Sequence, residues 1–251
     1  VHSHQGTATP YHARPRCTVA AVDLAKQFIL MSRIALERQA GAGAGPAEGS
    51  EAVPMLQRVM VCTGGHCTAG PGSLPPEDHP DFLRLEREAE GFIAALAGAL
   101  TRGSIVVDVF GAGQCPLDVP MLYPLTQNTG GSLLMYESFE SREYLACLKA
   151  AHDRFVGVGA VVDLRLSEKL AVEQIIGPIK PLSHERQMQR MAAAAGGGLS
   201  ELSDNAVEMT SAEKGHGITV AFRVKGDIPQ AAVYLQMDVR YTDLSDGKVK
   251  H

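Results

Sequence analysis

The chain has 251 residues, 45% of them hydrophobic and 20% charged, which is enough for one large domain or two modest ones with real cores. Its formal charge of -5 excludes an overall positive field, so we expect no nucleic-acid partner and no membrane binding by charge alone. No apolar run approaches the roughly 20 residues of a membrane-spanning helix, and the start lacks the apolar core of a signal peptide. The five scattered cysteines suit a reducing compartment. We expect a cytoplasmic protein and, since no initiator Met is present, a piece of a longer one.

The first half of the chain alternates helices and strands. Apolar residues at helical spacing, and continuous apolar runs stopped by glycines, mark the two kinds of element. The predicted elements in chain order are helix 18–37, buried strand 58–62, helix 81–100, strand 104–110, short helix 118–125, strand 132–136 and helix 140–152. Pro120 is expected in the first turn of its helix. Strands that are apolar on both faces and alternate with helices predict a parallel sheet covered on both sides, an α/β fold.

The second half contains strands without crossover helices. The predicted strands are 156–166, 170–176, 217–224 and 232–241. Consecutive strands of this kind predict an antiparallel sheet or sandwich. We place one domain at 1–153 and a partial β-sandwich domain at 154–251. Two stretches rich in alanine and glycine, about 40–54 and 184–200, are expected to be flexible inserts.

Enzyme signatures are weak. Gly111-Ala-Gly113 follows a strand, as in a dinucleotide loop, but Pro116 stands where the third glycine belongs, so a plain turn is favoured. Cys62, His66 and Cys67 lack the second ligand pair of a zinc site, so packing is favoured for them. No catalytic motif is present. The histidines lie in polar contexts and are expected to face solvent: His79, His152, His184 and His216.

Several segments carry a family resemblance in colinear order. Residues 58–72, RVMVCTGGHCTAGPG, resemble the pattern R-[IV]-M-x-F-x-G-G-P-x-T-x-G-P-G, and residues 126–139 resemble T-x-x-T-G-G-x-x-[VL]-x-x-D-S-F. Residues 107–110 and 117–119, the stretch 157–178, the segment 228–247 and the start 14–20 add weaker matches. Together they resemble the inner-layer subunit of the COPII vesicle coat, the Sec twenty-three family. Departures include His66 in place of proline and Val19 in place of glycine.

This resemblance implies a doubly wound trunk domain of von Willebrand A type followed by an antiparallel β-sandwich. It implies a cytoplasmic coat subunit in ER-to-Golgi transport, peripheral on the cytosolic face of the ER membrane and of coated vesicles. The implied partners are the cargo-binding coat subunit as heterodimer, the coat's small GTPase and the outer-coat subunits. The family activates that GTPase through an arginine in a module expected after residue 251. Its zinc module is expected before residue 1, which leaves no cofactor, metal or catalytic residue in this chain.

Two loops with family signatures are the candidate partner-binding sites. The candidate residues are Thr63, Gly64, Gly65, Cys67, Thr68, Gly70, Pro71, Gly72, Asn128, Thr129, Gly130 and Gly131. Loops at the carboxyl ends of parallel strands often present binding surfaces, which favours the first loop. A plain alternative stays open, because glycines also permit turns where nothing binds.

Three other interpretations stay open at this level. The chain could be the sister cargo-binding coat subunit, which shares the architecture. It could be a nucleotide-binding α/β enzyme that uses the Gly111 loop. It could also be too truncated to act, with unpaired edge strands.

Overall fold

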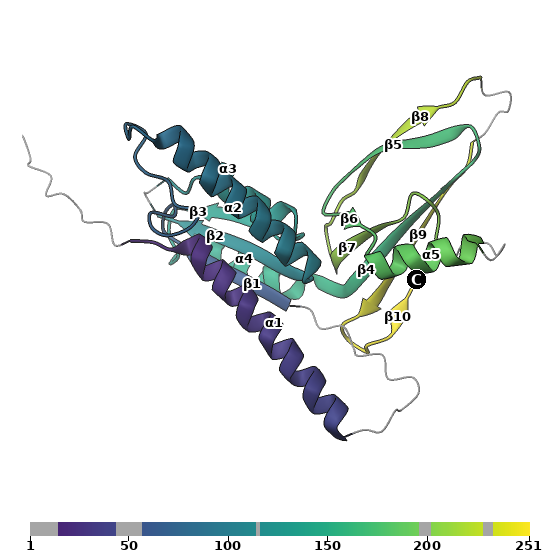
Figure 1. The fold of residues 1–251 in the computed structure, drawn as a ribbon, viewed down its shortest axis with the longest axis horizontal. Helices are drawn as coiled ribbons and strands as arrows, with labels where there is room; N and C mark the ends of the chain where they lie inside the picture. Colours follow the sequence, from purple (N-terminus) through teal and green to yellow (C-terminus); the bar gives the residue numbers. More distant parts are fainter. Residues whose placement is uncertain (1–14, 44–56, 114–115, 196–201, 228–232) are drawn as a thin grey trace, which may run out of the picture.

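The computed structural model describes residues 15–43, 57–113, 116–195, 202–227 and 233–251. Figure 1 shows two parts, an α/β part coloured purple to teal and a β part coloured green to yellow. Within the described residues, no helix combines the length and apolar character needed to cross a membrane.

A three-stranded parallel sheet of order β1-β2-β3 organises the α/β part. Its strands are β1 (Gln57–Thr63), β2 (Ile105–Ala112) and β3 (Leu133–Tyr136), and its helices are α1 (Thr18–Gly43), α2 (Phe82–Arg102), α3 (Val119–Gln127) and α4 (Arg142–Asp153). Pro120 lies in the first turn of α3, as predicted. Ser141 caps α4, because its hydroxyl accepts a hydrogen bond from the Tyr144 amide at 3.0 Å.

The central strand β2 is buried along its whole length. Val107 and Val109 pack in one core with α1, α2 and α3. Phe110 points to the opposite face, where it packs against Tyr144 of α4. Because side chains alternate along a strand, both faces of the sheet are covered, and the predicted parallel α/β arrangement is confirmed.

Strand β1 differs from the expectation of a buried strand. Among the described strands it pairs only with β2, so it lies at an edge of the sheet. Met60 is 43% exposed and Cys62 is also exposed. A continuous apolar run cannot distinguish a strand covered on both faces from an edge strand, which is why the prediction failed here.

The second part is antiparallel throughout. Its elements are β4 (Phe155–Leu166), β5 (Leu170–Ile176), β6 (Lys180–Pro181), α5 (His184–Ala195), β7 (Val207–Glu213), β8 (Thr219–Val224), β9 (Leu235–Asp243) and β10 (Val249–Lys250). Five strands form a sheet of order β10-β9-β4-β7-β6, and β5 and β8 form a second sheet. Val162 and Leu164 of the larger sheet pack against Val172 and Val220 of the smaller one. The predicted antiparallel sandwich is confirmed.

Two segments correct the predicted local structure. Residues 184–195, expected within a flexible insert, form helix α5. Helix α1 continues to Gly43, while residues 44–54 of the first expected insert lie outside the described residues.

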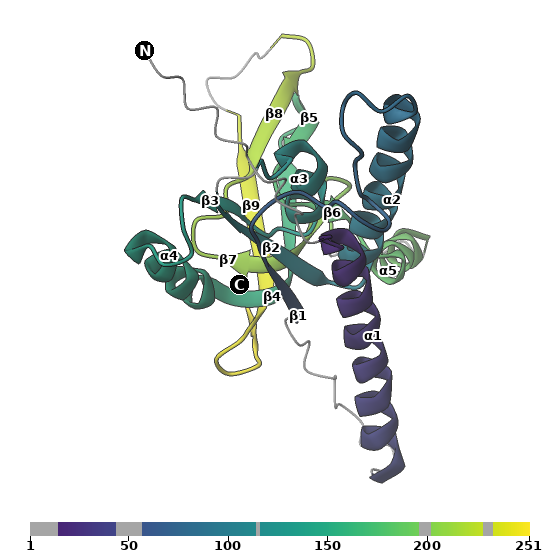
Figure 2. The same cartoon turned by 90° about the vertical axis from the view of Figure 1, so that its left-hand side faces the viewer.

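Strand β7 was missed because three of its buried positions are polar, which hides the alternation: Glu208, Thr210 and Ser211. Figure 2 shows the long α1 extending past the parallel sheet.

Candidate partner-binding site

The first candidate loop, Thr63–Gly72, leaves the carboxyl end of β1. The Thr63 hydroxyl is buried and donates to the Gly65 carbonyl at 2.7 Å, which closes a tight turn directly after the strand. Gly70 and Gly72 both have φ of 78°, a conformation that side chains other than glycine rarely adopt. Contacts and glycines within the loop therefore fix part of its shape.

Arg16 holds this loop from the segment before α1. Its amide donates to the Thr68 hydroxyl at 2.8 Å, and its carbonyl accepts from the amides of Thr68 at 2.9 Å and Ala69 at 3.1 Å. Its guanidinium Nε donates to the His66 carbonyl at 3.2 Å and lies against Gly65, where a Cβ would collide with it. The loop is thus bound to the start of α1 by paired backbone and side-chain contacts.

The second candidate loop, Asn128–Gly131, connects α3 to β3. The buried Thr129 hydroxyl donates to the Leu125 carbonyl at 2.8 Å and accepts from the Val107 amide at 3.0 Å. Gly131 lies so close to β2 that a Cβ there would fall on the Val107 carbonyl oxygen. These contacts fix the end of α3 to the central strand.

The structure places the two loops at opposite ends of the sheet. The first follows β1, whereas the second precedes β3, and the strands are parallel. The second loop faces the sandwich, where the Gly130 carbonyl lies 3.2 Å from His216 Nε2. The loops therefore do not form one surface.

The candidate residues differ in exposure. Those open to solvent are Gly64, Thr68, Gly70, Pro71 and Asn128, whereas those buried are Thr63, Gly65, Cys67, Gly72, Thr129 and Gly130, and Gly131 is intermediate. Buried members can shape a binding surface but cannot touch a partner directly. Partner binding by these loops stays a prediction, and it narrows to the exposed residues.

A charged contact that the sequence analysis missed lies between the two parts. Asp108, in the middle of β2, is fully buried and forms ion pairs with Arg58 of β1 and with Arg154 Nη2, the latter at 2.5 Å. It also accepts from the Ser132 amide at 2.8 Å. A buried carboxylate is tolerated only when its charge and lone pairs are satisfied, as they are here.

Arg154 also contacts the sandwich, so it connects the two parts. Its Nε lies 2.6 Å from Glu213 Oε2 at the end of β7, and its guanidinium also lies 5.1 Å from the Phe155 ring centre. The Arg58 guanidinium lies 4.5 Å from the same ring, within the range of cation–π attraction. His216, expected to face solvent, is instead largely buried beside Glu213, with Nε2 3.4 Å from Oε2. We call Arg58, Asp108, Arg154 and Glu213 the charged clasp.

Burial raises the pKa of Glu213 above its ordinary value of 4.5, although Ser211, His216 and Arg154 oppose the shift. A carboxyl with a higher pKa in the folded protein binds protons more readily there. Its contribution to stability is therefore greatest at low pH and falls as the pH rises from 4.5 through the folded value.

Glu213→Gln should remove this dependence. We expect the difference in free energy of unfolding, wild type minus variant, to decrease as the pH is raised from 4.5 to 8. Urea unfolding at several pH values measures it, with exposed Glu173→Gln of β5 as the matched control. A difference that grows with pH would show that the ion pair with Arg154 outweighs burial.

Comparison with known proteins shows which proteins the chain resembles. No protein-family model matches the chain. SEC23 A of Arabidopsis thaliana, named a protein transport protein, is 30% identical over 246 residues, which cover 96% of this chain and 25% of that protein. SEC23 F of the same plant is 24% identical over 98% of this chain and 32% of its own length. The human COPII-coat protein Sec24c has the same fold, with a TM-score of 0.53 and 19% identity over 79% of this chain and 25% of that one.

The chain thus resembles a divergent piece of a Sec23/Sec24 protein. Its parallel α/β part and its antiparallel β-sandwich match the fold of the human Sec24c protein. It spans about a quarter to a third of the length of the curated relatives that it matches.

The residues of the alternative chemical sites contact other parts of this chain. The buried Leu117 side chain lies directly over Gly111, where a pyrophosphate would have to approach the backbone. The thiols of Cys62 and Cys67 have different neighbours, Tyr144 Oη at 3.4 Å and the Arg16 carbonyl at 3.3 Å. Among the described residues, no three histidine, cysteine, aspartate or glutamate side chains gather as metal ligands. These positions offer no support for a nucleotide or zinc site.

Proposed function

We propose that the chain is part of a COPII coat subunit that acts in ER-to-Golgi vesicle transport. The observation that carries the proposal is the match to SEC23 A, which extends over 96% of the chain and through both parts of the fold. A match of this extent supports a shared architecture rather than a shared motif. The protein would act peripherally on the cytosolic face of the ER membrane and of coated vesicles.

The proposed role is structural. Residues 1–153 would form the trunk domain and 154–251 the sandwich domain of the inner coat layer. The trunk would bind the cargo-binding coat subunit and contact the coat's small GTPase, with the outer-coat subunits bound elsewhere. GTPase activation and zinc binding would depend on modules outside these 251 residues, so the chain would supply the scaffold and no catalytic arginine.

The test is binding of the purified chain to each candidate partner. We expect capture of the cargo-binding subunit in preference to a second inner-layer subunit, and no acceleration of GTP hydrolysis when the chain is added to the GTPase. Preference for an inner-layer subunit would instead assign the chain to the cargo-binding side of the pair. Binding to neither would contradict the proposal.

Pro71→Arg tests the first candidate loop. Pro71 is exposed and makes no described hydrogen bond that the substitution would remove. A charged side chain at an apolar contact should weaken binding to the cargo-binding subunit about tenfold, which corresponds to roughly 1.4 kcal/mol. The midpoint of urea unfolding should not change. Binding is measured by titration calorimetry.

Pro76→Arg, an exposed proline in the same connection, is the matched control. Equal affinities of the two variants would remove the loop from the binding surface while leaving the proposed function open.

A further inference from the structure

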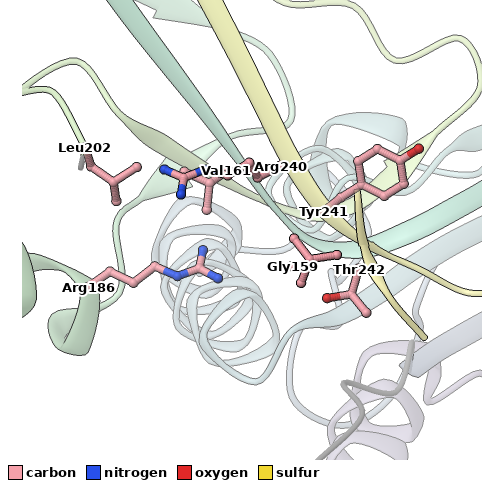
Figure 3. A pocket seen from close by; sticks show the side chains of 8 residues that line it. Gly159, Val161, Arg186, Leu202, Arg240, Tyr241 and Thr242 are labelled. Carbon is pink, nitrogen blue, oxygen red and sulfur yellow. The ribbon is translucent and has the colours of Figure 1, made fainter. Parts of the chain in front are cut away.

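A small hollow lies on the outer face of the five-stranded sheet. It has a volume of about 190 Å³ and is lined by Gly159, Val161, Arg186, Leu202, Arg240, Tyr241, Thr242 and Val249. Figure 3 shows the Arg186 side chain extending from α5 toward the strands, with Thr242 and Tyr241 on the opposite side. The hollow is far from both candidate loops in sequence and uses none of their residues.

A β-bulge shapes this hollow. Val158 pairs with Thr242 and Val161 pairs with Arg240, so two residues of β4 face Tyr241 alone. Gly159, at the bulge, has φ of 62° and no atom within 4 Å of the place where a Cβ would lie. Bulges bend a strand and redirect its side chains, and they are over-represented at sheet edges and next to active sites. Here the bulge leaves an open space beside Arg240.

Two guanidinium groups from separate elements line the same space. Arg240 of β9 is mostly buried, with 18% of its side chain exposed, and its Nε lies 3.7 Å from Asp238. Nη1 of Arg186, on α5, lies 3.2 Å from Oε1 of Glu208. Glu208 is shared, because it also accepts from the Ser183 amide at 2.9 Å and lies 3.9 Å from Lys180 Nζ. One carboxylate divided among three donors leaves Arg186 only partly neutralised.

We propose that this hollow binds a phosphate group. Guanidinium groups bind phosphate oxygens in two-pronged, charge-assisted hydrogen bonds, and two of them can hold one dianion from two sides. The Thr242 hydroxyl lines the same space and can donate a further bond. The volume is below the roughly 300–1,000 Å³ of pockets for drug-sized ligands, which suits a single small group.

The phosphate could be a soluble anion or the monoester headgroup of a lipid, and the chemistry of recognition is the same. Arg186, Arg240, Thr242 and the bulge form the proposed phosphate site whether or not the chain belongs to a coat.

Inorganic phosphate is the first probe. We expect it to raise the melting temperature of the full chain above the value in sodium chloride of equal ionic strength, since a ligand of the folded state stabilises it. Arg186→Gln should weaken the apparent phosphate affinity roughly ten- to hundredfold, the loss expected for a charge-assisted hydrogen bond. Arg240→Lys keeps the charge but removes the fork of donors, and it should weaken binding in the same direction.

Arg223→Gln is the matched control, because Arg223 is exposed on β8 and the change in net charge is the same. Vesicles of phosphatidylcholine with and without phosphatidylinositol 4-phosphate separate the two sources, and either source supports the inference. No stabilisation beyond that of chloride, or equal phosphate affinity in Arg186→Gln and Arg223→Gln, would overturn it.

Discussion

Asp108→Asn is expected to lower the free energy of unfolding by about 3–5 kcal/mol, the usual cost of breaking a buried ion pair by removing one partner. The change keeps the shape of the side chain but removes its charge. Arg58 and Arg154 would then remain largely buried beside a neutral group. Urea denaturation followed by circular dichroism measures the effect.

Asp227→Asn provides the matched control, because Asp227 is exposed beyond the end of β8 and the change in charge is identical. We expect it to alter stability by less than about 0.5 kcal/mol. If both variants unfolded at the same urea concentration, the charged clasp would contribute nothing to stability.

Gly131→Ala is expected to destabilise the protein by about 3 kcal/mol, near the upper end of the range for overpacking a well-filled core. The added methyl group would collide with the Val107 carbonyl of the central strand, and backbone cannot move aside as a flexible side chain can. The loop from Asn128 would have to shift, which would disturb the Thr129 bond to the Val107 amide. Thermal and urea unfolding both measure this loss.

The comparison variant is Gly217→Ala, because no atom lies within 4 Å of the place of a Cβ there. It should be nearly neutral. Retention of wild-type stability by Gly131→Ala would mean that this glycine is present for another purpose, such as contact with a partner.

The sequence predicted the elements that depend on local pattern. The unbroken apolar run of β2 and the helical spacing of α2 appear where expected, because a central strand and an amphipathic helix each repeat one signal over several residues. Strand β7 was missed for the opposite reason. The inward side chains of β7 include Glu208, whose burial depends on partners distant in sequence.

The opposite placement of the two candidate loops could have been deduced. In a parallel sheet, a loop that follows a strand and a loop that precedes one lie at different ends, whatever their composition. Likewise, Asp108 stands alone in an apolar run, and such a position requires buried positive partners. The identity of those partners, Arg58 and Arg154, could not be deduced, because they lie 50 and 46 residues away.

The charged clasp lies at the start of β4, where it connects the two sheets mechanically. Arg154 immediately precedes this strand, and β4 then runs through the middle of the five-stranded sheet, between β9 and β7. Figure 1 shows it passing from one part into the other. A force that bends the two parts against each other would thus be transmitted from the centre of one sheet to the centre of the next, not through a loose tether. Such a joint resists changes in the angle between the two parts.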